Sequence, residues 1–223
     1  MEELLHGDPL DLVGPIEVGV ALGEECRQEK VGVILGPGAN LKRSPLCGRN
    51  FEYFSEDPYL TGEVAASHIN GVQSQGIGTS MKHYAVNNQE YRRLVIDAIV
   101  DEKTLREVYL RPFKGVLDHV TPACMMTAYN RVNGHYASEH PHLLASILRG
   151  QWAYDGVVVS DWGGTNDRTA ALIAGLDLEM PGSEGFHDEE LLSAVERGQL
   201  DEAIIDRSLR RILHLILNTA PEP

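Results

Sequence analysis

Short runs of buried-strand type alternate with helical segments along most of the chain. Three of these runs, 31–36, 123–128 and 156–160, consist almost entirely of apolar and small residues. Such continuous apolar character is typical of strands that are covered on both faces. Strands of this kind alternating with helices indicate a parallel sheet with crossover helices. The fold class that we expect is α/β, a TIM-like (β/α) barrel.

The predicted elements are too few for a complete barrel. The expected strands are 31–36, 76–81, 123–128, 156–160 and 176–180, with 94–100 as a doubtful sixth. The expected helices are 16–30, 58–75, 101–119, 141–153, 166–174, 188–197 and 202–217. A complete barrel has eight strands and about 250 residues. With 223 residues and no repeat or linker, the chain (1–223) is predicted to be one domain holding an incomplete barrel.

Local signals support several of these helices. Asp57 followed by Pro58 is a favoured start for the second helix, and Asp101 opens the third. The last helix has apolar residues at helical spacing, which should pack on the core. These residues are Ile205, Leu209, Ile212, Leu213 and Ile216.

Composition excludes several kinds of partner. The net charge of −14 argues against a nucleic-acid partner, which favours a basic face. No apolar run reaches the roughly 18 residues that a membrane span needs. Cys26, Cys47 and Cys124 form no CxxC pair, so neither a zinc site nor a disulfide framework is expected. Reduced thiols and the lack of a signal-peptide pattern favour a cytoplasmic protein.

The run from Gly156 to Gly164 carries the strongest functional signal. A buried strand ends directly in Ser160-Asp161-Trp162, so a carboxylate and an indole ring are placed at the strand's C-terminal tip. In parallel barrels this tip is where the chemistry takes place. A carboxylate can attack an anomeric carbon while an aromatic face packs against a sugar ring. The alternative is that Asp161 only caps the following helix.

Polar groups also follow the other predicted strands. Arg49 and its neighbours follow 31–36, Lys82-His83 follow 76–81, and Tyr129-Asn130 follow 123–128. Cations, amides and phenols at one rim would suit a polyhydroxylated ligand, because each buried hydroxyl needs a partner. A cation close to Asp161 would also help keep its carboxylate ionised.

Four motifs in this order resemble glycoside hydrolase family 3, in its β-glucosidase and β-xylosidase branch. They are Arg43-x-Pro45-Leu46-x-Gly48-Arg49-Asn50-Phe51-Glu52-x-x-Ser55-Glu56-Asp57-Pro58, Lys82-His83, Met126-x-x-Tyr129-Asn130 and Ser160-Asp161-Trp162. The resemblance covers about residues 18–217. The family's N-acetylglucosaminidase branch has glycines after Lys-His, whereas Tyr84-Ala85-Val86-Asn87 follow here.

The resemblance implies a retaining hydrolase of terminal β-D-glucosyl or β-xylosyl residues, without a metal or cofactor. Asp161 would be the nucleophile that forms a covalent glycosyl-enzyme. Arg49, Lys82 and His83 match residues that hold sugar hydroxyls in the −1 subsite. Tyr129 matches a tyrosine close to the nucleophile, and Trp162 matches the ring that lines the subsite. The expected partner is a small β-glucoside or oligosaccharide.

The resemblance also implies parts that this sequence does not show. In this branch the acid/base Glu comes from a separate C-terminal α/β domain, and an N-terminal segment supplies the first barrel strand and a sugar-binding Asp. Neither Asp8 nor Asp11 is assigned that last role. We therefore expect a domain truncated at both ends and weakly active alone. The alternative is a non-catalytic sugar-binding module, or one that depends on a homodimer or a complementing chain.

Other interpretations of single residues stay open. Arg49 could pair with Glu52, Glu56 or Asp57 in a structural network. Lys82 could be the amine of a Schiff-base lyase. Carboxylates near strand ends that could replace the missing acid are Glu90, Glu179 and Glu184. The histidines at 135, 140 and 142 have no metal-ligand spacing. The preference for glucose or xylose is also open.

Overall fold

The computed structural model describes residues 12–219. Asp8 and Asp11 therefore lie outside the described residues. The elements in chain order are α1 (Val13–Gln28), β1 (Val33–Ile34), α2 (Pro58–Gln73), β2 (Gly78–Tyr84), β3 (Asp97–Ala98), α3 (Glu102–Thr104), η2 (Leu105–Tyr109), α4 (Arg111–His119), β4 (Cys124–Thr127), β5 (Arg131–Val132), β6 (His135–Tyr136), η3 (Ala137–Glu139), η4 (His142–Gln151), β7 (Val157–Val159), α5 (Arg168–Ala174), α6 (Phe186–Glu196) and α7 (Glu202–Thr219).

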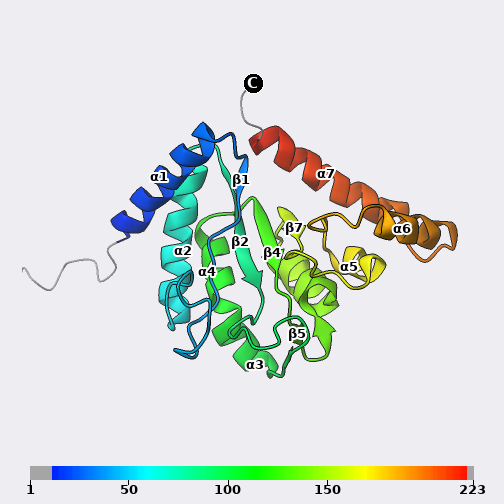
Figure 1. The fold of residues 1–223 in the computed structure, drawn as a ribbon, viewed down its shortest axis with the longest axis horizontal. Coiled ribbons are helices and arrows are strands. Elements are labelled where there is room, and N and C mark those ends of the chain that lie inside the picture. The colour runs from blue at the N-terminus through cyan, green and yellow to red at the C-terminus, as the bar shows by residue number, and fades with distance from the viewer. Residues whose placement is uncertain (1–11, 220–223) are drawn as a thin grey trace, which may run out of the picture.

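A parallel four-stranded sheet in the order β1-β2-β4-β7 forms the centre of the molecule (Figure 1). Its register pairs Val33 with Gly78, and Cys124 with both Ser80 and Val157. The predicted strand at 176–180 contributes a single parallel bridge, between Leu178 and Val159. The α/β class with parallel strands is thus confirmed. Within residues 12–219 the sheet stays open, with β1 at one edge and the Leu178 bridge at the other.

The doubtful strand at 94–100 does not join this sheet. Only Asp97–Ala98 is extended there, and it belongs to a second, three-stranded sheet in the order β3-β5-β6. Its partner β5 turns back into β6 through Asn133 and Gly134, both of which have positive φ. Such a two-residue turn suits a tight hairpin. This small sheet lies at the end of the molecule away from the C-terminal end of α7 (Figure 1).

Alternate residues of the strands face two different hydrophobic clusters. Met125 and Val158 point into the larger cluster, which α2, α4, η4 and α5 cover with residues such as Ile69 and Phe113. Their neighbours Met126 and Val159 point the other way, into a smaller cluster. This period of two is what a pleated strand imposes. The sheet is therefore covered on both faces, as its continuous apolar strands predicted.

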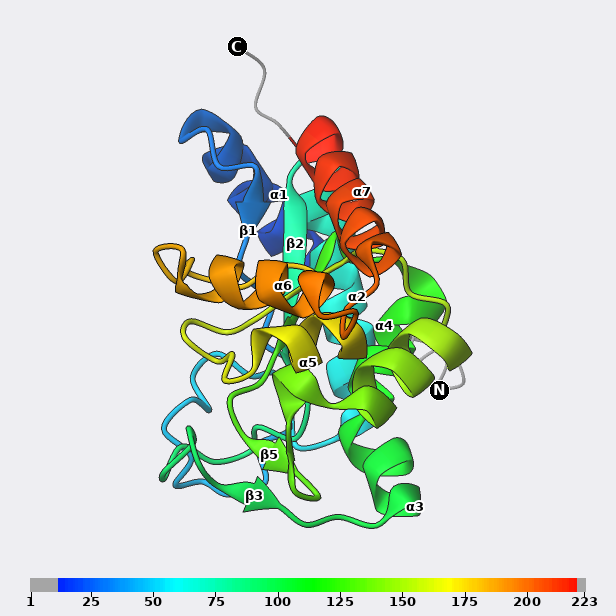
Figure 2. The same ribbon diagram turned by 90° about the vertical axis from the view of Figure 1, so that its right-hand side faces the viewer.

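The predicted packing of the last helix is confirmed for Ile205 and Ile212 but not for the rest of the predicted stripe. Ile212 and Leu215 pack on the smaller cluster, and Ile205 packs with α5 and α6. Figure 2 shows α5, α6 and α7 together on one side of the molecule. The prediction for Leu209, Leu213 and Ile216 is wrong, because these three side chains are about half exposed. Polar contacts explain the orientation of the helix: Ser208 and Arg211 both donate hydrogen bonds to the buried carboxylate of Asp177.

Two predicted helix starts are confirmed, and one predicted helix is interrupted. Asp57 accepts a hydrogen bond from the Leu60 N–H at 2.7 Å, and Asp101 accepts one from the Thr104 N–H at 3.0 Å. The segment 101–119 contains the wider π-type turn η2 before α4 begins. Pro112 lacks an N–H and its ring crowds the preceding turn, which favours such widening.

Candidate active site

The predicted site residues converge where the parallel strands end. Asp161 follows β7 by two residues, Tyr129 follows β4 by two, and Lys82 and His83 lie near the end of β2. The pairing of β2 with β4 shifts between Met81 and Tyr84, at the point where Lys82 and His83 stand. Such a bulge redirects side chains from their regular alternation. Side chains from three separate strands are thereby directed to one edge of the sheet.

Asp161 is buried, with 8% of its surface exposed, and its two carboxylate oxygens differ. Oδ1 accepts a hydrogen bond from the Trp162 N–H at 2.8 Å. Oδ2 lies 3.5 Å from His83 Nε2 and forms no hydrogen bond with the described residues. A buried acceptor without a hydrogen bond is costly, and in a folded protein it needs an explanation such as a catalytic role. The helix-capping alternative is wrong, because Asp167 caps α5 through the Ala170 N–H.

Backbone hydrogen bonds fix the turn that carries Asp161 and Trp162. The Gly164 N–H donates to the Asp161 carbonyl at 2.9 Å. Tyr129 Oη donates to the Trp162 carbonyl at 2.9 Å, and Ser138 Oγ donates to the Gly164 carbonyl at 2.7 Å. The turn is therefore anchored on both sides, which keeps the Asp161 carboxylate on a rigid support.

Tyr129 and Trp162 lie beside Asp161, as predicted. Burial and the nearby Asp161 carboxylate raise the pKa of Tyr129 to about 12, so its hydroxyl stays protonated and can donate. The Trp162 side chain is 43% exposed, so its ring is open to a ligand. The Arg93 guanidinium lies 4.7 Å from the centre of the Tyr129 ring, a contact that the sequence analysis missed.

His83 is buried and neutral. Burial, with the charges of Arg49, Lys82 and Arg93, lowers its pKa well below the ordinary value. The side chain of Asn40 holds its backbone: Asn40 Nδ2 donates to the His83 carbonyl, and Asn40 Oδ1 accepts from the His83 N–H, both at 2.9 Å. A neutral imidazole thus stands next to Asp161. The charges of Arg49, Lys82 and Arg93 act on this same histidine from outside the pair.

Arg49 and Lys82, the two cations expected to hold sugar hydroxyls, both contact Glu52. Arg49 Nε donates to one oxygen of Glu52, and Lys82 Nζ lies 3.3 Å from the other. Burial opposes ionisation of Glu52, but the Arg49 hydrogen bond and the two positive charges outweigh it and lower its pKa. Among the three partners proposed for Arg49, the structure selects Glu52. Glu52 thus holds both cations at the rim. Their N–H groups that do not contact Glu52 can donate to a ligand.

The remaining carboxylates near the strand ends have partners of their own. Glu90 pairs with Arg93 at 2.9 Å, and Glu179 lies 2.7 Å from His187 Nδ1. Glu184 lies in the loop before α6 and has positive φ. None of these contacts marks one of the three as a proton donor to a ligand at Asp161.

The histidines near β6 use their nitrogens in hydrogen bonds. His140 Nε2 lies 3.1 Å from the Val132 carbonyl, and its Nδ1 accepts from the Leu143 N–H at 3.4 Å. His142 pairs with Glu102 at 3.0 Å. Across residues 12–219, no group of three or more His, Cys, Asp or Glu side chains could hold a metal ion. The same residues contain no helix long and apolar enough to cross a membrane.

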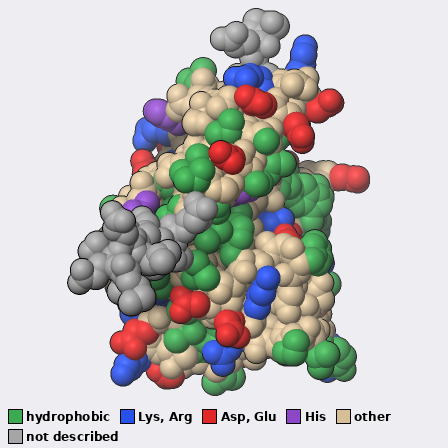
Figure 3. Space-filling model, turned by 90° about the vertical axis from the view of Figure 1, so that its left-hand side faces the viewer, with side chains coloured by type: hydrophobic (Ala, Val, Ile, Leu, Met, Phe, Trp, Pro, Cys, Tyr) green, Lys and Arg blue, Asp and Glu red, His purple; other side chains and the backbone are tan. Residues whose placement is uncertain are grey.

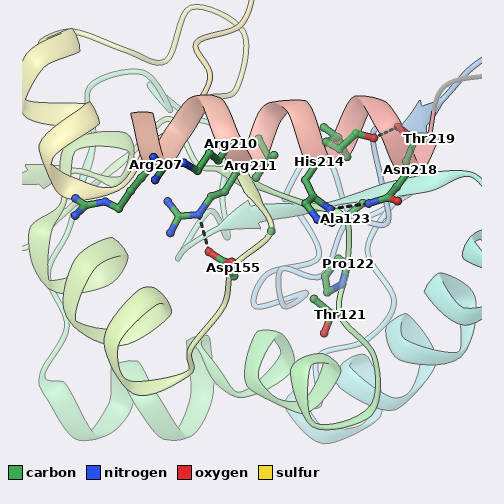
Figure 4. Close-up of a pocket in the computed structure, with 13 residues that line it drawn as sticks. Thr121, Pro122, Ala123, Asp155, Arg207, Arg210, Arg211, His214, Asn218 and Thr219 are labelled. Carbon is green, nitrogen blue, oxygen red and sulfur yellow. Dashed lines mark hydrogen bonds and ion pairs between the residues drawn. The ribbon is translucent and has the colours of Figure 1, made fainter. Parts of the chain in front are cut away.

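A separate pocket of about 420 Å³ lies at the opposite ends of the strands, under α7 (Figure 4). Thr121 to Ala123 and Asp155 to Val157, at the starts of β4 and β7, form one side. Arg207, Arg211 and His214 line the helix side, and Arg211 is already paired with Asp155 at 2.8 Å. This pocket shares no residue with the rim around Asp161.

Comparison with known families identifies the relatives of this chain. Residues 10–215 match the model of the glycosyl hydrolase family 3 N terminal domain. The chain belongs to this family. The resemblance inferred from the motifs is therefore confirmed, over nearly the same residues.

Characterised members of glycosyl hydrolase family 3 share much of this sequence. The chain is 58% identical to the thermostable β-glucosidase B of Acetivibrio thermocellus, over 89% of this chain and 26% of that protein. It is 48% identical to an exo-α-(1→6)-L-arabinopyranosidase of Bifidobacterium longum, over 91% of this chain and 27% of that protein. The chain thus spans about a quarter of the length of these relatives.

Solved family 3 structures share the fold. A β-glucosidase of Bifidobacterium adolescentis matches with a TM-score of 0.91 and 45% identity, over 94% of this chain and 31% of that one. The β-glucosidase 3B of Thermotoga neapolitana, in complex with α-D-glucose, matches with a TM-score of 0.89 and 44% identity, over 93% of this chain and 30% of that one. The α/β fold of the chain is that of the family's N-terminal domain.

Proposed function

We propose that this chain is the sugar-binding and nucleophile-bearing part of a retaining β-glycosidase that acts on terminal β-D-glucosyl or β-xylosyl residues. The observation that carries the proposal is Oδ2 of Asp161, a buried carboxylate oxygen without a hydrogen bond at the end of a parallel strand. We also propose that the open sheet is part of a (β/α) barrel, since the matched family domains have the same strand arrangement.

The proposed reaction has two steps. In the first, Oδ2 of Asp161 attacks the anomeric carbon, the glycosidic C–O bond breaks, and the leaving oxygen departs with a proton. In the second, water attacks the same carbon and gives a proton back to the group that supplied the first one, the sugar is released, and Asp161 returns to its carboxylate form. Retaining enzymes place the proton donor about 5–5.5 Å from the nucleophile. Because Glu52 and Glu90 are ion-paired, we propose that a separate segment or chain supplies this acid.

The other rim residues fit roles in binding the sugar. Arg49 and Lys82 are both paired with Glu52, and their other N–H groups would donate to sugar hydroxyls. His83 would donate from Nε2, close to the reacting carboxylate. The exposed Trp162 ring offers a flat face for the C–H groups of the sugar. Tyr129 would act mainly by holding the backbone of Trp162.

Two observations define alternatives to test. The arabinopyranosidase relative, at 48% identity, makes α-L-arabinopyranosides candidate substrates beside β-glucosides and β-xylosides. The unpaired edge of β1 within the described residues favours a partner-dependent module, since an open sheet edge can pair with another segment or a second copy. Light scattering with and without a complementing chain would detect such a partner.

Hydrolysis of dinitrophenyl glycosides tests the role of Asp161, because this leaving group needs no proton donor. We expect Asp161→Asn to lower the rate by about a thousandfold or more while leaving the fold intact, since Asn can still accept from Trp162. Asp155→Asn, at the far ends of the strands, is the matched control and should keep full activity. Full activity of Asp161→Asn would exclude Asp161 as the nucleophile.

A further inference from the structure

A chain of buried polar groups runs behind the Asp161 carboxylate. Asn87 Nδ2 lies 3.4 Å from Tyr53 Oη, and Tyr53 Oη lies 3.2 Å from His83 Nδ1. On the other side of the ring, His83 Nε2 lies 3.5 Å from Asp161 Oδ2. All four side chains are buried. The hydrogens along this series of four side chains must all point in one direction, because a misplaced hydrogen would bring two donors or two acceptors into contact.

The environment of Nδ1 allows either neutral form of His83. Nδ1 lies 3.2 Å from Tyr53 Oη and also 3.2 Å from Asn40 Oδ1. The amide oxygen of Asn40 can only accept, so that contact requires a hydrogen on Nδ1. The phenol of Tyr53 can donate, and that contact then requires a lone pair on Nδ1 and a hydrogen on Nε2.

Two contacts and the protonation state of Tyr53 favour the form with the hydrogen on Nε2. Asp161 Oδ2 only accepts, so a lone pair of Nε2 facing it would be repulsive. Asn40 Oδ1 is already satisfied by the His83 backbone N–H at 2.9 Å. Burial raises the pKa of Tyr53, so this phenol keeps its hydrogen to donate.

Asn87 fixes the direction in which that hydrogen points. Its Nδ2 lies 3.4 Å from a carboxylate oxygen of Glu90 and 3.4 Å from Tyr53 Oη. The contact with Glu90 identifies this atom as the donor end of the amide, because a carboxylate oxygen accepts. Tyr53 therefore accepts from Asn87 and directs its own hydrogen to His83.

We propose that Tyr53 is a positioning residue that holds His83 with its hydrogen on Nε2, the ring nitrogen that lies 3.5 Å from Oδ2 of Asp161. The consequence for catalysis rests on the proposed function: the N–H would orient the attacking oxygen and any sugar hydroxyl beside it. The tautomer itself does not depend on that function and can be measured without a substrate.

Nitrogen NMR of the chain labelled with [¹⁵N]histidine measures the tautomer directly. In the wild type we expect the His83 ring to show a protonated Nε2 and an unprotonated Nδ1. In Tyr53→Phe we expect a shift toward protonated Nδ1, which then donates to Asn40. Tyr84→Phe is the matched control: it removes a buried hydroxyl next in sequence to His83, but one that donates to the Leu143 carbonyl. Its His83 signals should stay as in the wild type.

Two results would overturn the proposal: a wild-type His83 with the hydrogen on Nδ1, or an unchanged tautomer in a folded Tyr53→Phe. The first result needs no variant, so the proposal can be contradicted even if Tyr53→Phe does not fold. If the chain is a glycosidase, Tyr53→Phe should also lower its kcat/KM by roughly tenfold to a hundredfold, as when partners that orient metal-bound histidines are removed. Absence of all activity would count against the proposed function but not against the tautomer.

Discussion

Two buried aspartates flank β7, and their hydrogen bonds suit different roles. Each oxygen of Asp177 has partners: Oδ2 accepts from the Val158 N–H at 2.8 Å and from Arg149, and Oδ1 accepts from Ser208 and Arg211. A carboxylate satisfied in this way holds elements together. Oδ2 of Asp161 has no such bond with the described residues and lies 3.5 Å from the neutral His83. Oδ2 of Asp161 can therefore still contact a ligand, whereas both oxygens of Asp177 are already hydrogen-bonded.

Another buried histidine, His140, should make the fold sensitive to acid. Burial and the nearby His135 lower the pKa of His140 to about 4, whereas an unfolded chain has a histidine pKa near 6.5. As the pH falls from 6.5 to 4, the unfolded chain binds the proton first. The free energy of unfolding should therefore fall across this window, by at most about 3 kcal/mol from this residue.

Urea unfolding at pH 7, 6 and 5 would measure this contribution. His140→Gln removes the titrating group but keeps an N–H that can reach the Val132 carbonyl, so it should lose less stability on acidification than the wild type. His214→Gln, at an exposed position on α7, is the control and should follow the wild type. Equal acid sensitivity of His140→Gln and the wild type would contradict this account.

At the scale of elements, α1 and α2 approach closely because glycines face each other. A Cβ at Gly19 would lie 2.3 Å from the His68 carbonyl oxygen and 3.0 Å from Gly71 Cα. A Cβ at Gly14, in the same helix, would meet nothing within 4 Å. The two positions share one helix but differ in the space around them.

Alanine at these two positions should have different effects. Gly19→Ala should lower the free energy of unfolding by about 2–3 kcal/mol, since the backbones must separate. Gly14→Ala should change it by less than about 0.5 kcal/mol, because the helix preference of alanine is offset by its crowding against the Pro15 ring. Urea unfolding of both variants would measure the difference. Similar changes in both would show that α1 is not packed on α2 in this way.

Periodicity predicted the elements well because it reports burial directly. The apolar runs at 123–128 and 156–160 became β4 and β7, and Asp57 and Asp101 began helices where expected. Contacts that depend on distant residues could not be predicted in the same way. The exposed side of α7 follows from Asp177, and the interrupted helix at 101–119 shows the local effect of Pro112.

The candidate site was predicted at the level of which residues meet, but only partly at the level of how they pair. The strand-end rule gathered Asp161, His83 and Tyr129 correctly. Glu52 was one of three partners considered for Arg49, and the structure selects it, but the contact of the same carboxylate with Lys82 was missed. The roles of Tyr53 and Asn40 had no signal in the sequence, because their partners lie 30 and 43 residues away.

At the scale of the whole molecule, the chain matches only part of the longer relatives compared with it. It spans 26% of the Acetivibrio thermocellus relative, so the substrates and partners of a complete enzyme stay proposals. The net charge of −14 is not gathered on the side that bears α1, where acidic and basic side chains are interspersed (Figure 3). The described cysteines are free. The location in the cell stays a prediction.

The central claim, that Asp161 is a nucleophile in a working sugar site, is tested most directly by covalent trapping. The chain is incubated with 2-deoxy-2-fluoro-β-D-glucosyl fluoride, which carries its own leaving group and needs no proton donor. Intact-mass measurement and peptide mapping should show one added fluoroglucosyl group, on Asp161, and none in Asp161→Asn. A label on another residue, or no label on a folded wild-type chain, would contradict the claim.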